Sequence, residues 1–237
     1  MKLSVIIPAF NEQARLPQTL QEASAWLNQH FADTYEIIVV DDGSQDETCQ
    51  RVSALQDEIS SLSLLIQPEN KGKGAAVRRG MLEARGKICL FMDADHSTHV
   101  REVLKVQSVM QQTAADVVIA SRQHPDSQIS QHQSWLREHM GKSFNLLMRS
   151  LIGLDFPDTQ CGFKAFTQNA AKAIFANQQL DGFSFDVEVL FLAQRMNLSI
   201  HEVPVEWINE PNSRVRMLVD PAKMFADILR IRKIHRQ

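Results

Sequence analysis

The sequence predicts an α/β fold in which helices flank a mostly parallel central sheet. Five short apolar runs, rich in Val and Ile, alternate with segments of helical period, as in buried parallel strands joined by crossover helices. A polar cluster follows each of the first four runs. Such clusters are expected at the carboxyl edge of an open parallel sheet, where ligands bind. The 237 residues, 44% of them hydrophobic, suit one domain of this class.

The predicted elements follow in chain order. Strands are expected at residues 3–7, 36–40, 62–66, 87–92 and 116–120, with helices at 12–30, 46–58, 74–85 and 100–112 between them. The alternation breaks after Arg122. The remaining chain predicts a polar loop at 123–133, a helix at 134–151, a loop at 153–160, a strand at 163–166, helices at 168–177 and 186–197, a strand at 200–207 and a terminal helix at 221–235 that Pro221 opens.

Asp93 and Asp95 leave the fourth strand with only Ala94 between them. Two carboxylates turned toward one point repel each other unless a cation joins them, and hard divalent cations prefer such oxygen ligands. The alternative is a turn with a helix cap, because Asp is favoured at caps. The position after a buried strand favours a metal site for Mg²⁺ or Mn²⁺. His96 and His99 lie beside it, but a hard cation prefers oxygen to imidazole.

Two further clusters follow the second and third strands. Asp41 or Asp42 can accept the N3–H of a uracil base, and Gly43 lets a nucleoside approach the backbone; Ser44 or Asp46 caps the next helix. Lysines alternate with glycines at residues 70–74, where the next helix begins. This run lacks the P-loop spacing, so it is either an anion-binding loop or an ordinary one.

The second half of the chain carries less specific signals. Asp158 lies in a polar loop that enters the strand at 163–166, and Asp186 and Glu188 are either helix-capping or pocket-lining residues. Seven basic residues against two acidic ones give residues 212–237 a net charge of +5. Interleaved apolar residues make this segment either a basic amphipathic helix at a membrane surface or a helix packed on the core.

Charge, cysteines and hydropathy exclude several classes of protein. The net charge of −3 argues against a nucleic-acid-binding protein. Three widely spaced cysteines form neither a disulfide framework nor a zinc pattern, and predict free thiols in a reducing compartment. The first apolar run stops at Pro8, and no apolar run reaches the length of a membrane span. We therefore expect a cytoplasmic protein whose contact with the inner face of the membrane, if any, is peripheral.

The motifs resemble those of family 2 glycosyltransferases, and almost the whole chain takes part in the resemblance. The donor-side motifs are residues 5–12, 39–44, 70–74 and 93–95. Residues 158–164, 185–188 and 203–207 are most similar to the dolichyl-phosphate β-glucosyltransferases, with the dolichyl-phosphate mannosyltransferases as close relatives. Eukaryotic members usually have an N-terminal membrane anchor, which is not seen here. The resemblance implies a Rossmann-like GT-A fold in one domain, 1–237.

The resemblance also implies a division of labour within that domain. Residues 1–122 would form the nucleotide-sugar-binding half, 123–211 the acceptor-side half and 212–237 a basic C-terminal helix. The donor would be bound by Pro8, Ala9, Glu12, Asp41, Asp42, Lys73, Asp93 and Ala94, with the metal on Asp93 and Asp95. Arg122, Arg137 and Arg214 would hold the acceptor phosphate, and Asp158 would orient the acceptor or stabilise the sugar at the reacting centre.

The implied activity is inverting transfer of a hexose to a polyprenyl or dolichyl phosphate, with UDP-glucose as the favoured donor. The sequence leaves open glucose against mannose and UDP against GDP. Two rival functions are a family 2 transferase that acts on a polysaccharide or protein-bound sugar, and a nucleotide-sugar-binding protein without turnover. The presence of both Asp93 and Asp95 argues against the second rival. A scaffolding protein would not need polar clusters on four strand ends.

Overall fold

The computed structural model describes residues 1–130, 152–208 and 220–235. Its main sheet has the strand order β3-β2-β1-β4-β7-β5-β8, in which β7 runs antiparallel to both of its neighbours and every other pair is parallel. The strands are β1 (Leu3–Ala9), β2 (Tyr35–Asp41), β3 (Leu62–Ile66), β4 (Ile88–Met92), β5 (Val117–Ser121), β7 (Phe163–Thr167) and β8 (Ile200–Pro204).

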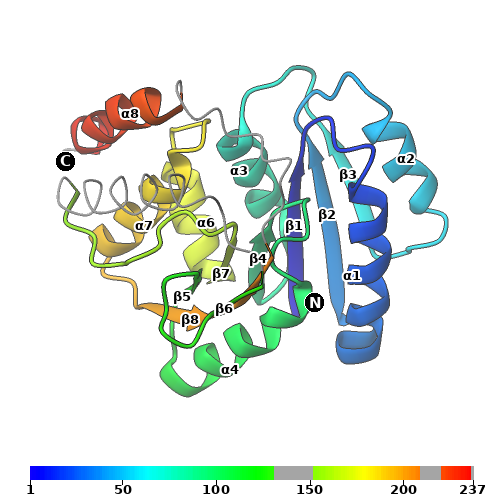
Figure 1. Cartoon of the computed structure of the whole chain (residues 1–237), viewed down its shortest axis with the longest axis horizontal. Helices are drawn as coiled ribbons and strands as arrows, with labels where there is room; N and C mark the ends of the chain where they lie inside the picture. The colour runs from blue at the N-terminus through cyan, green and yellow to red at the C-terminus, as the bar shows by residue number, and fades with distance from the viewer. Residues whose placement is uncertain (131–151, 209–219, 236–237) are drawn as a thin grey trace.

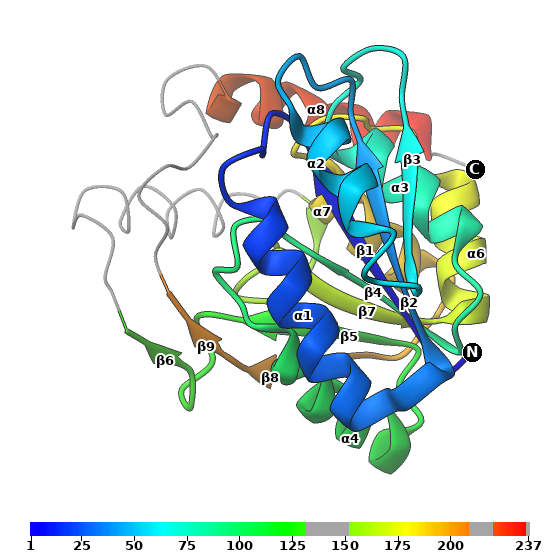
Figure 2. The ribbon, with the colours of Figure 1, turned by 90° about the vertical axis from the view of Figure 1, so that its right-hand side faces the viewer.

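Helices cover both faces of this sheet (Figures 1 and 2). One core cluster packs beneath α1 (Leu16–Phe31), α2 (Thr48–Leu55) and α4 (Val103–Thr113). A second core cluster packs beneath α3 (Lys73–Glu83), α6 (Gln168–Asn177), α7 (Phe185–Arg195) and α8 (Asp220–Ile234). Strands such as β1, which are wholly buried, therefore need apolar residues on both sides, and this explains their continuous rather than alternating hydrophobic pattern.

The predicted elements agree with this structure within a few residues where it is described. The predicted strand at 200–207 is interrupted after Pro204 and continues as β9 (Glu206–Trp207). The expectation of a plain loop at 123–133 was incomplete, because it contains β6 (Gln128–Ile129), which pairs with β9. Short 3-10 turns, Ala32–Thr34 and Val100–Glu102, flank β2 and α4. The helix predicted at 134–151 lies outside the described residues.

Parallel strand directions bring the polar loops to one edge of the sheet. β1 and β2 both run upward in Figure 1, and the loops that follow them meet at the upper end of the molecule. Side chains interlock these two loops: Ser44 Oγ accepts the N–H of Asn11 (2.8 Å), and Thr48 Oγ1 accepts the N–H of Glu12 (2.8 Å). The edge that the sequence predicted for ligands is thus built from loops that brace one another.

The state of the cysteines and the hydropathy of the helices can be read directly from the structure. The three cysteines are free thiols; Cys89 and Cys161 are buried and Cys49 is half-buried. Burial raises the pKa of the Cys161 thiol to about 12, so this thiol stays protonated at neutral pH. Among the helices that the structure describes, none combines the length and the hydropathy that crossing a bilayer requires.

Candidate active site

Asp93 and Asp95 lie directly after β4, on either side of the buried Ala94. Asp93 forms an ion pair with Lys73, whose Nζ is 2.6 Å from Asp93 Oδ1, and the Asp93 side chain remains 34% exposed. Burial and then the nearby charge of Asp93 raise the pKa of the Asp95 carboxyl. The two carboxylates are therefore close enough to repel and are open to solvent. A hard divalent cation would relieve that repulsion, so these residues fit the metal site that the sequence predicted.

Gly162 makes room for the Asp93 carboxylate. The Asp93 N–H donates to the Gly162 carbonyl oxygen (3.1 Å), which brings the two backbones together where β4 pairs with β7. A Cβ atom at residue 162 would lie 1.9 Å from Asp93 Oδ2. The sequence contained this glycine within the 158–164 motif but offered no reason for it. The structure supplies the reason, because any side chain there would displace a metal-ligand candidate.

Lys73 belongs to an array of alternating charges beneath the site. Burial lowers the pKa of Lys73, but the carboxylates of Asp93 and Asp186 outweigh burial, so that the pKa is raised and the ammonium is retained. Asp186 is itself paired with the fully buried Lys164, whose Nζ is 2.5 Å from Asp186 Oδ1 and donates to the Cys161 carbonyl at 2.6 Å. Neither Lys164 nor this pairing was singled out from the sequence. A lysine in the apolar strand at 163–166 was the available signal.

The two carboxylates after β2 have different surroundings. Asp42 accepts three hydrogen bonds, from Gln67 Nε2 (2.6 Å) and from the N–H groups of Lys71 and Gly72 (2.8 Å each). It thereby fixes the loop that carries Lys73. Asp41 accepts the Ser44 N–H through Oδ2 (2.9 Å), while the buried Oδ1 has no hydrogen-bond partner among the described residues. Among the described residues, no protein group donates a hydrogen bond to this Oδ1 atom, so it is a candidate acceptor for a ligand.

The other donor-side candidates line the end of β1. Pro8 and Ala9 are the last, buried residues of that strand, paired with β2. Glu12 follows and is ion-paired with Arg15. These residues lie on the same edge as Asp41 and Asp42, since Ala9 and Asp41 are register partners. The structure therefore gathers the predicted donor-side residues around neighbouring strand ends, although their contact with a nucleotide remains a prediction.

Asp158 and Arg122 form a two-pronged ion pair at the end of β5. The Nε–H and Nη2–H groups of Arg122 donate to Asp158 Oδ2 (2.7 Å) and Oδ1 (2.8 Å), and the backbone N–H of Arg122 adds a third bond to Oδ2 (2.9 Å). Burial alone would raise the pKa of Asp158, yet the Arg122 charge holds it at about 2. Asp158 is fully buried, whereas the Arg122 side chain is 28% exposed. The geometry therefore makes Asp158 a positioning residue for Arg122; its predicted contact with substrate remains a prediction.

Asp186 and Glu188, predicted as helix-capping or pocket-lining residues, are both buried in the first turn of α7, and the N-cap residue is Ser184. Glu188 accepts the N–H groups of Gln179 (2.9 Å) and Leu180 (2.8 Å), and His235 Nε2 lies 2.7 Å from its Oε1. It thus ties α8 and the 178–182 turn to α7. Arg137 and Arg214, which were predicted to hold the acceptor phosphate, lie outside the described residues.

Comparison with known proteins agrees with this arrangement. The model of the family "Glycosyl transferase family 2" matches residues 4–175. A dolichyl-phosphate beta-glucosyltransferase of Dictyostelium discoideum is 39% identical over an alignment of length 240, with 97% of this chain and 73% of the relative covered. Its human counterpart is 34% identical, with 98% of this chain and 75% of the relative covered. The yeast counterpart, from Saccharomyces cerevisiae, is 34% identical, with 97% and 74% covered.

Solved structures match in fold. Glucosyl-3-phosphoglycerate synthase from Mycobacterium tuberculosis in complex with phosphoglyceric acid has a TM-score of 0.71 at 21% identity, covering 97% of this chain and 79% of the synthase. The same synthase in complex with Mn²⁺, UDP and glucosyl-3-phosphoglycerate has a TM-score of 0.69, also at 21% identity, covering 97% and 78%. The predicted GT-A fold is confirmed by this likeness. The family match over residues 4–175, with relatives 34–39% identical over nearly the whole chain, shows that this chain is a member of glycosyl transferase family 2.

Proposed function

We propose that this protein transfers glucose from UDP-glucose to a polyprenyl phosphate such as dolichyl phosphate, with inversion at the anomeric carbon. The observation that carries the proposal is the pair Asp93 and Asp95 at the carboxyl edge of the sheet. Both side chains are partly exposed, and Lys73 forms an ion pair with Asp93. Relatives with 34–39% identity across nearly the whole chain are named dolichyl-phosphate beta-glucosyltransferases, which supports the choice of sugar and acceptor.

On the donor side, residues 1–122 would bind the nucleotide sugar. The Oδ1 atom of Asp41 would accept the uracil N3–H, with Pro8, Ala9 and Glu12 forming the adjoining wall of the pocket. Asp42 would act through the loop it fixes rather than through the ligand. Asp93 and Asp95 would hold Mg²⁺ or Mn²⁺, which supplies Lewis-acid stabilisation to the departing diphosphate. Lys73 would then turn from Asp93 toward the diphosphate oxygens, because its flexible ammonium is a donor to either.

On the acceptor side, residues 123–211 would bring a lipid phosphate to the sugar. A phosphate monoester is largely dianionic at neutral pH, since its second pKa is about 6. One of its oxygens can therefore attack the anomeric carbon without a general base while the bond to UDP breaks on the opposite face. Arg122 would position this phosphate with the N–H donors that Asp158 does not use. Arg137 and Arg214 are proposed as further phosphate contacts from the sequence alone.

The terminal helix offers a surface for the lipid-bearing membrane. On α8, Ile228 and Ile231 are buried in the core, whereas Phe225 and Leu229 are 40% and 53% exposed. The exposed basic residues Arg230, Arg232 and Lys233 flank this second apolar face. Apolar side chains between basic ones suit the interface of an anionic bilayer. We propose that α8 gives the protein a peripheral contact with the cytoplasmic face of the membrane, beside the catalytic edge (Figure 1).

The decisive experiment incubates radiolabelled UDP-glucose and Mn²⁺ with the protein and one of three acceptors: dolichyl phosphate, undecaprenyl phosphate or a soluble glucan. We expect label in the lipid fraction, in an alkali-stable β-linked product, with none in glucan. EDTA and the Asp95→Asn substitution should each abolish transfer while circular dichroism stays unchanged. Label that appears only in glucan would replace the lipid acceptor by a polysaccharide. Tight UDP binding without transfer or donor hydrolysis would contradict the proposal that the protein is an enzyme.

A further inference from the structure

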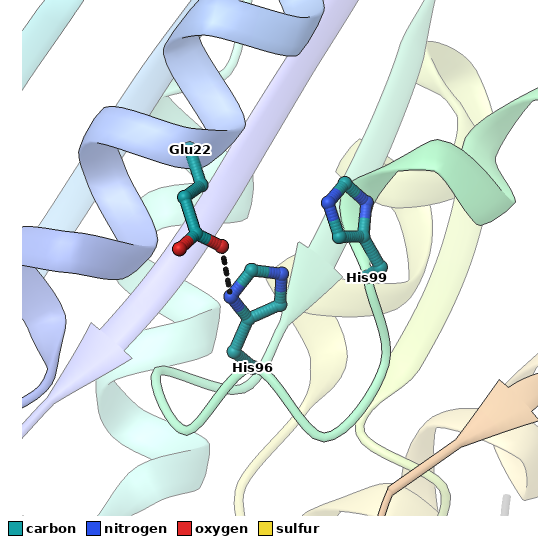
Figure 3. A group of neighbouring side chains, drawn as sticks. All are labelled: Glu22, His96 and His99. Carbon is teal, nitrogen blue, oxygen red and sulfur yellow. Dashed lines mark ion pairs between the residues drawn. The ribbon is translucent and has the colours of Figure 1, made fainter.

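A second group of side chains that can bind a metal lies beside the pair Asp93 and Asp95. It consists of Glu22 on α1 and His96 and His99 in the turn after β4 (Figure 3). One ligand atom from each residue can be chosen so that all three lie within 4.8 Å of one another. The Nδ1 atom of His96 is 3.1 Å from Glu22 Oε2, and the two imidazole rings are tilted by 44° with centroids 4.7 Å apart.

The spacing of these atoms suits a small divalent transition-metal ion. Bonds from Zn²⁺ to nitrogen and oxygen ligands of about 2.0–2.1 Å place neighbouring ligand atoms of a tetrahedron about 3.4 Å apart. The contact between His96 and Glu22 already has nearly this length, and a rotation of His99 toward them would complete the other two sides. Two imidazoles and one carboxylate select borderline ions such as Zn²⁺, whereas the all-oxygen pair Asp93 and Asp95 selects Mg²⁺ or Mn²⁺.

The backbone holds the three residues in this arrangement. His96 has φ of 60°, in the left-handed region that non-glycine residues seldom adopt, and this turns its side chain toward α1. Thr19 Oγ1, one turn before Glu22, donates to the Ala94 carbonyl (3.0 Å) and binds α1 to the same turn. His99 Nδ1 accepts the Arg101 N–H (3.0 Å) at the start of a three-residue 3-10 turn. An ion bound to His99 Nε2 would move the ring proton to Nδ1, so the exposed hydrogen bond from Arg101 would be replaced by a metal bond.

We propose that Glu22, His96 and His99 form a binding site for a Zn²⁺-class ion that ties α1 to the turn carrying Asp95. Three protein ligands leave one coordination position to water. The ion would be distinct from the one on Asp93 and Asp95 and would need no nucleotide sugar for its binding. Because His96 follows Asp95 directly in the chain, the ion would restrict the turn from which the catalytic pair projects.

The test uses the full chain with Asp93→Asn, which disables the catalytic pair so that one site remains. Zn²⁺ is titrated by calorimetry, and Co²⁺ is added as a spectroscopic probe, because its visible d–d bands reveal a tetrahedral or five-coordinate nitrogen-containing site. We expect one Zn²⁺ per chain, d–d bands with Co²⁺ and a rise in Tm on adding Zn²⁺. Glu22→Gln, His96→Asn and His99→Asn should each weaken Zn²⁺ binding on the order of 100-fold, since loss of a direct ligand exceeds the effect of losing an outer partner.

The substitutions are chosen to keep the fold. Asn tolerates the left-handed backbone at residue 96, and at residue 99 it can still accept the Arg101 N–H as a helix-capping residue. His30→Asn, on the same helix as Glu22, serves as the matched control and should bind Zn²⁺ as before. Unchanged Zn²⁺ affinity in all three variants, or absent d–d bands, would reduce the cluster to an ordinary His96–Glu22 ion pair and overturn the proposal. Neither outcome depends on transferase activity, so failure here leaves the proposed function standing.

Discussion

At the scale of single residues, the most constrained position of the site is Gly162. A Cβ atom at this residue would overlap the Asp93 carboxylate, so alanine here forces the Asp93 side chain to move aside. We predict that Gly162→Ala reduces Mn²⁺-dependent transfer at least about 100-fold, because a metal ligand moved by about 1 Å loses its geometry. The loss of stability should be smaller, about 1–3 kcal/mol. Enzyme assays across Mn²⁺ concentration and urea unfolding measure the two effects.

The control for that substitution is Gly182→Ala. Gly182 lies in the neighbouring 178–182 turn, and a Cβ atom there would meet no heavy atom within 4 Å. It should therefore retain transfer within a factor of about two. Equal losses in both variants would show that the local chain tolerates no alanine at all, and the specific contact with Asp93 would lose its support.

A second prediction concerns the contribution of the Asp158–Arg122 ion pair to the free energy of unfolding. Asp158→Asn leaves the Arg122 charge without its buried partner, and we expect the free energy of unfolding to fall by about 3 kcal/mol at pH 7. The pKa of Asp158 in the folded protein is lowered to about 2 from 3.8. Its stabilisation is therefore complete above pH 4 and is lost as the pH falls through about 2. Urea unfolding at pH 5 and pH 7 should show the same difference between variant and wild type; a difference that grows between these pH values would implicate another group.

The sequence predicted those residues of the site that lie directly beside a strand or helix end. Asp93, Asp95 and Lys73 each lie directly after a strand or at the start of a helix, so strand periodicity alone placed them on one edge. The pairing of Lys164 with Asp186 joins residues 22 positions apart through packing that no local pattern encodes. The same is true of the hydrogen bonds through which Asp42 holds the loop at 71–72, while its predicted contact with the nucleotide stays a prediction.

At the scale of elements, the alternation of strands and helices predicted the strands and their mostly parallel directions, but not the antiparallel direction of β7. The apolar run at 163–166 predicted a strand, yet nothing in it reveals that β7 runs antiparallel between β4 and β5. Side-chain alternation is the same for either direction, and only the connection and the partner strands decide. The two-residue strand β6 was missed, and the break between β8 and β9 was not predicted, because segments so short have no period to detect.

Helix α8 allows its two apolar faces to be separated experimentally. Ile231→Ala removes a fully buried side chain and should lower the free energy of unfolding by about 2–4 kcal/mol. Leu229→Ala removes an exposed one and should leave stability within about 0.5 kcal/mol, yet weaken sedimentation with vesicles that contain anionic lipid. If Leu229→Ala binds vesicles as tightly as the wild type, the proposed membrane contact of α8 must be given up.

At the scale of the whole molecule, binding and folding are linked. A ligand present at 100 times its Kd stabilises the native state by about 2.7 kcal/mol, which raises Tm by roughly 5–10 °C in a chain of this size. We predict such a rise for UDP-glucose with Mn²⁺, a smaller one for UDP-glucose with EDTA and the smallest for GDP-sugars. Asp93→Asn should remove the difference between Mn²⁺ and EDTA. A larger shift with GDP-mannose than with UDP-glucose would change the assigned donor.

The antiparallel strand β7 has a consequence for how the chain matures on the ribosome. Until Thr167 has been synthesised and released from the exit tunnel, β4 has no partner on one side and β5 has neither β7 nor β8. Residues 1–122 therefore lack the strand that lies between β4 and β5, and we expect β5 to join the sheet only once the later strands emerge. A nascent chain that ends at Arg122 should stay sensitive to protease, because the strand that pairs with both β4 and β5 comes later in the sequence.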